Sequence, residues 1–301
     1  MRALLVLAQA LTIVAAAPLL AGFIRKVKNN LRMRHGAPLL QPYHNLRKLM
    51  GKDEVIPRYS SWIFRAAPWI VLAATVAAVL PVPGLGPSCG LSRMGDFLLI
   101  LFLLALARFF LALGGLDAGS AFGGMGSSRE MFISSLVEPV AVLAVLAASF
   151  AARSTSPAAI AGVAAFRLSS FAAALSFFAV TLAETSRIPV DNQETHLELT
   201  MVHEAMLLEY SGRSLALLEL AAQVKQVIFF LLLVNVMAPW GIAGVPGAGI
   251  VVSAAKVCAL GCLVAVVEVS VAKMRLFRVV DFLSFSLVTA FMAVVMAAAG
   301  V

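Results

Sequence analysis

Eight apolar stretches in this chain are each long enough to cross a lipid bilayer as a helix. The hydrocarbon core is about 30 Å thick and a helix rises about 1.5 Å per residue, so about 20 residues suffice. The stretches lie near residues 3–24, 61–82, 96–114, 131–152, 160–183, 215–238, 247–271 and 279–300. Hydrophobic residues make up 61% of the chain, more than a single soluble core could enclose. We expect an all-α integral membrane protein with about eight transmembrane helices, in a single transmembrane domain over residues 1–301.

The loops between these stretches differ in their content of basic residues, and this difference predicts the orientation. Cytoplasmic loops of membrane proteins retain an excess of Lys and Arg. Fifteen basic residues fall in the first, third, fifth and seventh loops, whereas the opposite loops contain only Arg93 and Arg153. We therefore expect both termini outside the cytoplasm. This topology explains most of the net charge of +8 and removes the reason to expect nucleic acid as a partner.

Two of the expected cytoplasmic loops are long, loop 1 at residues 25–60 and loop 5 at residues 184–214. Both exceed the usual connection of about 2–8 residues between bundled helices, which is typical of functional or docking surfaces. In loop 1, Leu46 and Leu49 lie at helical spacing beside Arg47 and Lys48. This pattern suits a short helix on the membrane surface, and a solvated basic loop is an equally good interpretation.

Loop 5 is unusual because it gathers six of the fifteen carboxylates of the chain, Glu184, Asp191, Glu194, Glu198, Glu204 and Glu209. Thr195 followed by Glu198 forms a capping-box pattern, which predicts a helix with Glu198 and Glu209 on one side. Such a cluster beside a membrane suits proton collection or coupling, and a solvated helix face is the alternative. His196 and His203 are seven residues apart, too far to chelate one ion directly, so proton exchange or hydrogen bonding suits them better.

Charged side chains inside the apolar stretches form a second group. A lone ionised group at the bilayer centre costs at least about 2.5–3.5 kcal/mol, so such residues are usually paired or line a wet path. The candidates are Glu138, Glu219, Lys225, Lys256 and Glu268, with Arg108 and Arg167 as possible partners. Each alone could be a structural ion pair. Together they indicate a polar axis within the membrane that suits a proton relay.

One run of loop 5 resembles a known family. AETSRIPVD (Ala183–Asp191), followed by acidic residues and EYSG (Glu209–Gly212), is similar to the corresponding loop of the complex I subunit 1 family. The stretches Thr195–Arg213 and Ala107–Glu130 resemble one branch of it more closely. That branch is the membrane-anchor subunit of energy-converting NiFe hydrogenases, the group of formate hydrogenlyase subunit 4 and hydrogenase-4 component C. The resemblance marks as docking or structural residues Arg187, Pro189, His196, His203, Tyr210, Gly212 and Arg213.

The resemblance implies a membrane-anchor and coupling subunit in the cytoplasmic (inner) membrane of a prokaryote. Its implied partners are hydrogenase large and small subunits, iron–sulfur subunits and antiporter-like membrane subunits. We expect the NiFe centre and the iron–sulfur clusters in those partners, because this chain has three cysteines and no CxxC pair. We expect no catalytic residue, cofactor or metal in the chain itself. The resemblance implies that the chain links electron transfer to proton or sodium translocation. The alternatives are a quinone-site subunit of an NADH:quinone oxidoreductase and a stand-alone secondary transporter.

Overall fold

The computed structural model describes the chain except for residues 1, 84–95, 163–166, 192–200, 235–247 and 301. All regular secondary structure in the described residues is helical. The helices are α1 (Arg2–Leu31), α2 (Gln41–Met50), α3 (Trp62–Val79), α4 (Phe97–Asp117), α5 (Ala121–Ala152), α6 (Pro157–Gly162), α7 (Leu168–Glu184), α8 (His203–Leu207), α9 (Gly212–Leu232), α10 (Ala248–Ser270) and α11 (Leu276–Ala298).

Seven of these helices are long and apolar enough to cross a membrane, namely α1, α3, α4, α5, α9, α10 and α11. The chain is therefore a multi-pass, all-α membrane protein, as expected. The fifth expected span, near 160–183, is shorter than predicted, because α7 begins only at Leu168 and has 17 residues. Arg167 has an extended backbone at the start of α7, so it lies at a helix end rather than within a span. Eight spans and outside termini remain predictions.

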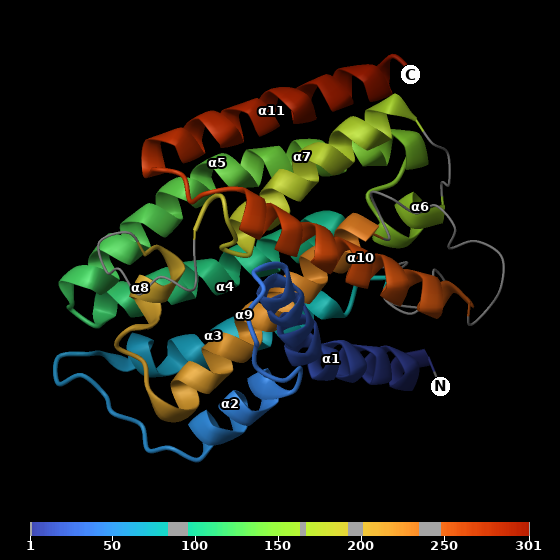
Figure 1. The fold of residues 1–301 in the computed structure, drawn as a ribbon. Coiled ribbons are helices and arrows are strands. Elements are labelled where there is room, and N and C mark those ends of the chain that lie inside the picture. Colours follow the sequence, from blue (N-terminus) through green and yellow to red (C-terminus); the bar gives the residue numbers. More distant parts are fainter. Residues whose placement is uncertain (1, 84–95, 163–166, 192–200, 235–247, 301) are drawn as a thin grey trace.

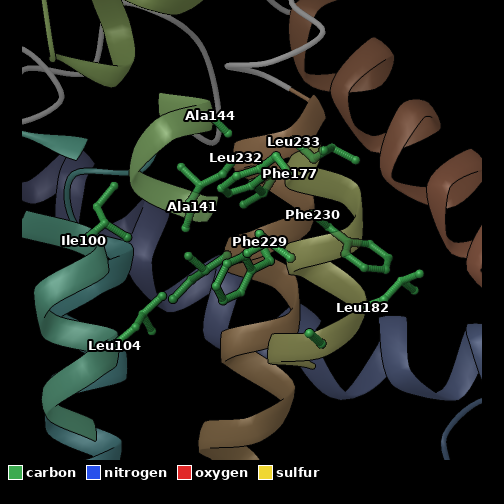
Figure 2. Close-up of a cluster of buried hydrophobic side chains, with 14 of the residues drawn as sticks. Ile100, Leu104, Ala141, Ala144, Phe177, Leu182, Phe229, Phe230, Leu232 and Leu233 are labelled. Atoms are coloured by element: carbon green, nitrogen blue, oxygen red, sulfur yellow. The ribbon is translucent and has the colours of Figure 1, made fainter. Parts of the chain in front are cut away.

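Helix α9 lies at the centre of the arrangement. It packs against α1, α2, α3, α7 and α10, while α5, α7 and α11 pack against one another along the opposite side (Figure 1). The apolar side chains between α9, α7 and α4 include Phe177 and Phe229, whose ring centroids are 5.9 Å apart (Figure 2). About two thirds of the apolar window of α9 is buried, the largest share among the seven spans. Most side chains of α9 are therefore held within the protein.

Loop 1 contains the predicted short helix, since α2 covers the segment with Leu46 and Leu49. The expected third loop is much shorter than the sequence indicated. Helix α4 continues to Asp117 and α5 begins at Ala121, where the Ser120 hydroxyl accepts a hydrogen bond from the amide of Gly123. The glycine-containing stretch at residues 121–126 is thus helical. Its small side chains let α5 approach other helices closely.

The helix expected from Thr195 is not formed as predicted. Thr195 and Glu198 lie outside the described residues, and the helix that follows, α8, begins only at His203 and ends at Leu207. Met201 is outside the helix, so no single helix carries residues 198–209. Helix α8 begins with a tertiary cap, because a carboxylate from the first part of loop 5 binds the amides of Val202 and His203, as described below.

Helices α5 and α8 touch at Gly126. A Cβ atom at this position would lie 2.8 Å from the Ala205 Cβ and 3.0 Å from the Val202 carbonyl oxygen. Both distances are shorter than ordinary van der Waals contact, and the carbonyl belongs to the backbone. Glycine at this position therefore permits the contact between α5 and the acidic loop. Gly124, on the same helix, has open space where its Cβ would be.

We predict opposite effects of alanine at these two glycines. Gly126→Ala forces α5 and α8 apart and should lower the free energy of unfolding by about 1–3 kcal/mol. Gly124→Ala meets no atom and removes a helix-destabilising glycine, so it should raise the stability by up to about 1 kcal/mol. The melting temperatures of the two variants in detergent, measured beside the wild type, test this. Equal melting temperatures would contradict the close contact.

Candidate functional site, a cavity lined by ion pairs

A cavity of about 490 Å³ opens between α1, α2, α9 and the segments on either side of α8. Its lining is rich in ionisable side chains. These are Arg25, Lys28, Glu184, Arg187, Asp191, His203, Glu204, Tyr210, Glu219, Lys225 and Glu268. Residues from the two long loops and from three membrane helices thus meet around one space.

Glu268, near the end of α10, is held by two cations. The Lys28 ammonium of α1 lies 2.7 Å from one carboxylate oxygen, and the Arg187 guanidinium donates to the other at 3.0 Å. Arg187 also donates to the side-chain oxygen of Gln226 on α9 at 2.9 Å. Glu268 is 3% exposed and Lys28 is 4% exposed. This cluster joins α1, α9, α10 and the first part of loop 5.

Glu184, the last residue of α7, is held by two other cations. The Lys225 ammonium of α9 is 2.6 Å from one carboxylate oxygen, and the Arg108 guanidinium of α4 is 3.0 Å from the other. Arg108 lies 3.5 Å from Glu138 of α5 as well. The Ser134 hydroxyl accepts a hydrogen bond from Arg108 and donates one to Glu138 at 3.1 Å. Arg108 therefore connects a buried carboxylate to Glu138, whose side chain is 50% exposed.

In both clusters, the ionised state of the carboxylate depends on the cations that lie beside it. Removing a charge from water costs several kcal/mol, and only close partners compensate for it. Displacing one cation from Glu268 or Glu184 would leave that carboxylate with a single partner. A proton could then replace the lost charge. The arrangement can therefore convert a movement of Arg187 or Lys225 into proton uptake or release.

Asp191, one of the loop 5 carboxylates that the sequence singled out, contacts both α8 and the segment after α10. One carboxylate oxygen accepts hydrogen bonds from the amides of Val202 and His203, at 3.2 and 3.3 Å, and so caps α8. The other oxygen lies 2.6 Å from the Lys273 ammonium, beyond the end of α10. The amide of Met274 also donates to the carbonyl of Pro189 at 2.9 Å. Loop 5 is thus fastened to the segment that follows α10.

Tyr210 anchors the second half of loop 5. Its ring stacks on Phe64 of α3 with centroids 4.1 Å apart, and its hydroxyl donates to the Phe64 carbonyl at 3.3 Å. The same hydroxyl fills the position that a Cβ of Gly114 would need. Burial raises the pKa of Tyr210, and the carboxylates of Asp117 and Glu54 act in the same direction. The phenol therefore stays protonated and remains a hydrogen-bond donor.

Gly212 joins loop 5 to loop 1. Its φ of +53° is in the left-handed region, and a Cβ there would lie 2.6 Å from the Asp53 carbonyl oxygen. Beside it the Ser211 hydroxyl accepts from the amide of Val55 at 2.8 Å. Only glycine meets both the backbone conformation and the close approach without strain. Arg213, the next residue, is exposed.

The structure brings together most of the in-span residues that the sequence singled out. Glu219, Lys225 and Glu268 line the cavity, and Glu138 is joined to it through Arg108. Lys256 does not line the cavity, because it is twelve residues from Glu268 on α10, about 18 Å along the helix.

The loop residues have mixed outcomes. Glu184, Asp191, His203 and Glu204 line the cavity, whereas Glu209 does not. Glu194, Glu198 and His196 lie outside the described residues.

Sequence reasoning missed one member of the network, Lys28, which was counted as a loop cation that sets orientation. Arg187 was singled out as a docking or structural residue, without its partners. Helix α1 in fact continues through Lys28 to Leu31. The buried positions Ala17, Leu20 and Ile24 form a stripe at helical spacing that Lys28 extends. That stripe was the available signal. No local pattern indicates the partners of Arg187, because they come from α9 and α10.

Comparison with known proteins identifies the family of this chain. The family model described as NADH dehydrogenase matches residues 3–299. Formate hydrogenlyase subunit 4 of Escherichia coli (strain K12) is 36% identical over 282 residues, which cover 90% of this chain and 90% of that protein. Hydrogenase-4 component C of the same organism is 33% identical over 292 residues, covering 93% and 92%. NADH-quinone oxidoreductase subunit 8 of Rhodothermus marinus is 30% identical over 220 residues, which cover 67% of this chain and 62% of that protein.

A solved structure has the same fold. It is a chain of the membrane-bound sulfane sulfur reductase, an archaeal respiratory membrane complex. The TM-score is 0.85 with 22% sequence identity, over 97% of this chain and 99% of that one. At this identity the likeness establishes the fold.

We predict that Glu268→Gln destabilises the protein strongly. The variant leaves the ammonium of Lys28 and the guanidinium of Arg187 without their carboxylate, and breaking a buried pair costs about 3–5 kcal/mol. Thermal unfolding measures the loss. Asp281→Asn is the matched control, because Asp281 is an exposed carboxylate on α11. A melting temperature of Glu268→Gln within a degree of that control would contradict the ion-pair geometry.

A second prediction concerns Asp191. Asp191→Ala removes the cap of α8, which is worth about 1 kcal/mol, so the amides of Val202 and His203 should exchange hydrogen about fivefold faster. Asp191→Asn keeps an oxygen for the cap and loses the ion pair, so its effect should be smaller and should match that of Lys273→Met. Hydrogen-exchange mass spectrometry of this segment measures the rates. Equal rates in Asp191→Ala and the wild type would argue against the cap.

Proposed function

This chain belongs to the NADH dehydrogenase family of the complex I subunit 1 type, and from that premise we propose that it is the membrane-anchor and coupling subunit of a multisubunit, energy-converting complex of the hydrogenase type. The observation that carries the proposal is the continuity between loop 5 and the ion pairs of the membrane helices. Arg187 belongs to the loop and Glu268 to a membrane helix, and they share a hydrogen bond. A force on the loop therefore acts directly on a buried charge.

The first step of the proposed mechanism is docking. A redox arm containing hydrogenase large and small subunits and iron–sulfur subunits binds the face formed by α2, α8 and the segment at residues 51–57. These elements are joined to each other through Ser211 and Val55, and to the membrane helices through Tyr210. The NiFe centre and the iron–sulfur clusters belong to those partner subunits. Electron transfer takes place there and changes the position of loop 5.

The second step is the response of the buried charges. When the loop withdraws Arg187 from Glu268, that carboxylate keeps only Lys28 and takes up a proton from the cavity. When Arg187 returns, its positive charge favours the carboxylate form, and the proton leaves. Glu184, the first residue of loop 5, responds in the same way when it moves away from Lys225. One cycle of the loop therefore protonates and deprotonates each carboxylate once.

The third step carries the charge change sideways. Arg108 contacts both Glu184 and Glu138, so a change at the cavity alters the environment of Glu138 on α5. The half-exposed side chain of Glu138 then faces antiporter-like membrane subunits, which extend the pathway for protons or sodium ions. The complex lies in the cytoplasmic membrane of a prokaryote.

Quinone reduction is the main alternative function. The cavity volume falls within the roughly 300–1,000 Å³ of small-molecule sites, but such sites are mostly apolar. This cavity is lined by four Lys and Arg residues and five Asp and Glu residues, which suits water and protons better than an apolar quinone ring. The hydrogenase-type relatives also cover 90% or more of this chain, against 67% for the NADH-quinone oxidoreductase relative. Both observations favour the coupling function.

We predict that Glu219→Gln uncouples the complex. Glu219 lines the cavity and is in no salt bridge within the described part of the chain, so glutamine removes its proton exchange with little cost to stability. The assembled complex in sealed vesicles should keep its hydrogen production and lose several-fold in ions translocated per hydrogen formed. Glu138→Gln should act in the same direction. Asp281→Asn, exposed on α11, is the control.

The outcomes of this experiment are distinct. Normal translocation in both Glu219→Gln and Glu138→Gln overturns the proposed pathway. Hydrogen production that fails with every variant, including Asp281→Asn, indicates loss of assembly, which native gel electrophoresis would detect. Quinone-dependent electron transfer that replaces hydrogen production in the wild-type complex supports the alternative function.

A further inference from the structure

A second, smaller cavity of about 30 Å³ lies between α3, α4, α5, α8 and α9. Its polar lining consists of Thr75, Arg108, Glu130, His203 and Lys225, and the rest of the wall is apolar. A space of this size holds one water molecule, provided that two to four polar partners surround it. His203 and Lys225 line the large cavity too, so they separate the two spaces.

Arg108 supplies an unused hydrogen-bond donor beside this cavity. Its side chain is 6% exposed, and its terminal nitrogens contact Ser134, Glu138 and Glu184. Its Nε has no hydrogen-bond partner among the residues that the structure describes. An unsatisfied buried donor costs about 1–3 kcal/mol, so such donors are normally satisfied by ordered water.

We propose that this cavity is a binding site for one water molecule, which accepts a hydrogen bond from Arg108 Nε and connects Glu130 and His203 to the ion pair of Glu184 and Lys225. The site gives protons a route from α5 that is separate from the mouth of the large cavity. This inference deepens the proposed function and rests on it.

The surroundings of His203 suit proton transfer through this water. Burial lowers the pKa of His203. The positive charge of Lys225 acts in the same direction, whereas the negative charges of Glu130 and Asp191 oppose it. Arg108 also faces the site, and Glu204 is the next residue in α8. The imidazole is therefore neutral at neutral pH, with one nitrogen that accepts a proton and one that donates. It can take a proton from the water on one nitrogen, while Glu130 returns a proton to the water, and release the proton of its second nitrogen into the large cavity, which His203 also lines.

The elements around the site are held at fixed positions. Arg129, beside Glu130, donates to the carbonyl of Met201 at 3.1 Å, which fastens α5 to the segment before α8. Asp191 binds the amide of His203 from the other side. Glu130 and His203 are thus kept on the same small cavity by contacts that do not involve their own side chains.

The site can be tested directly in the assembled complex. A cryo-electron microscopy map at a resolution that shows water should contain density within hydrogen-bond distance of Arg108 Nε. Ala107→Val adds two methyl groups to a buried residue that lines the cavity, and it should displace this density while leaving every charged residue in place. Ala112→Val, on the same helix and outside the cavity lining, is the control for overpacking. A wild-type map with no density at this position overturns the proposal.

The route is tested by His203→Gln in sealed vesicles, with ions translocated per hydrogen formed measured as a function of pH. In the wild type this ratio should fall on acidification through the lowered pKa of His203, because a protonated imidazole cannot accept a proton. In His203→Gln the ratio should be several-fold lower at neutral pH and should lack this acid limb. Ala107→Val should lower it too. Asp281→Asn, exposed on α11 and outside both cavities, is the control.

The failure of this inference is distinguishable from the failure of the proposed function. If Glu219→Gln lowers the ratio while His203→Gln and Ala107→Val both leave it and its pH profile unchanged, the water route is wrong and the coupling function stands. If all three variants and Glu138→Gln translocate ions normally, both are wrong. A lowered ratio in His203→Gln with an unaltered acid limb would assign His203 a structural role and would also overturn the route.

Discussion

The structure depends on two buried carboxylates that are each paired with two cations. Glu268 is held by Lys28 and Arg187, and Glu184 by Lys225 and Arg108. Buried charges are costly unless they are closely compensated, so these contacts fix the relative positions of the helices and loops that supply them. The same dependence makes the network sensitive. A small movement of one cation changes the charge balance of the whole cluster, which is the property that a coupling subunit requires.

Helix α9 contributes side chains to both ion-pair clusters and so connects them. It supplies Gln226 to the first cluster and Lys225 to the second, and it places Glu219 on the cavity between them. Its apolar side packs against α7 and α4 through Phe229 and its neighbours (Figure 2). A rigid, well-packed helix therefore carries the polar groups, while loop 5, held by Asp191 and Tyr210 at its two ends, supplies the part that a docked partner can move.

The sequence predicted the membrane-spanning helices well because hydropathy is a local property, carried by each stretch of about 20 residues regardless of its neighbours. It also predicted that Glu219, Lys225 and Glu268 belong to a polar region, since charge in an apolar stretch demands compensation. It named Arg108 as a possible partner, which pairs with Glu138 and Glu184, but it did not predict Lys28, which resembled an orientation signal. It also predicted one helix with Glu198 and Glu209 on one side, whereas Met201 is not helical and α8 covers only His203–Leu207.

The sequence by itself therefore determined that the protein lies in a membrane, that it is helical, and which buried charged residues need a partner. The tertiary structure alone decided which residues meet those needs. Arg187 reaches Glu268 across 81 residues of chain and Lys273 reaches Asp191 across 82, and no local pattern encodes such contacts. The physical reason is that hydrophobicity acts within each segment, whereas an ion pair acts between groups whose distance is set only when all the helices have packed.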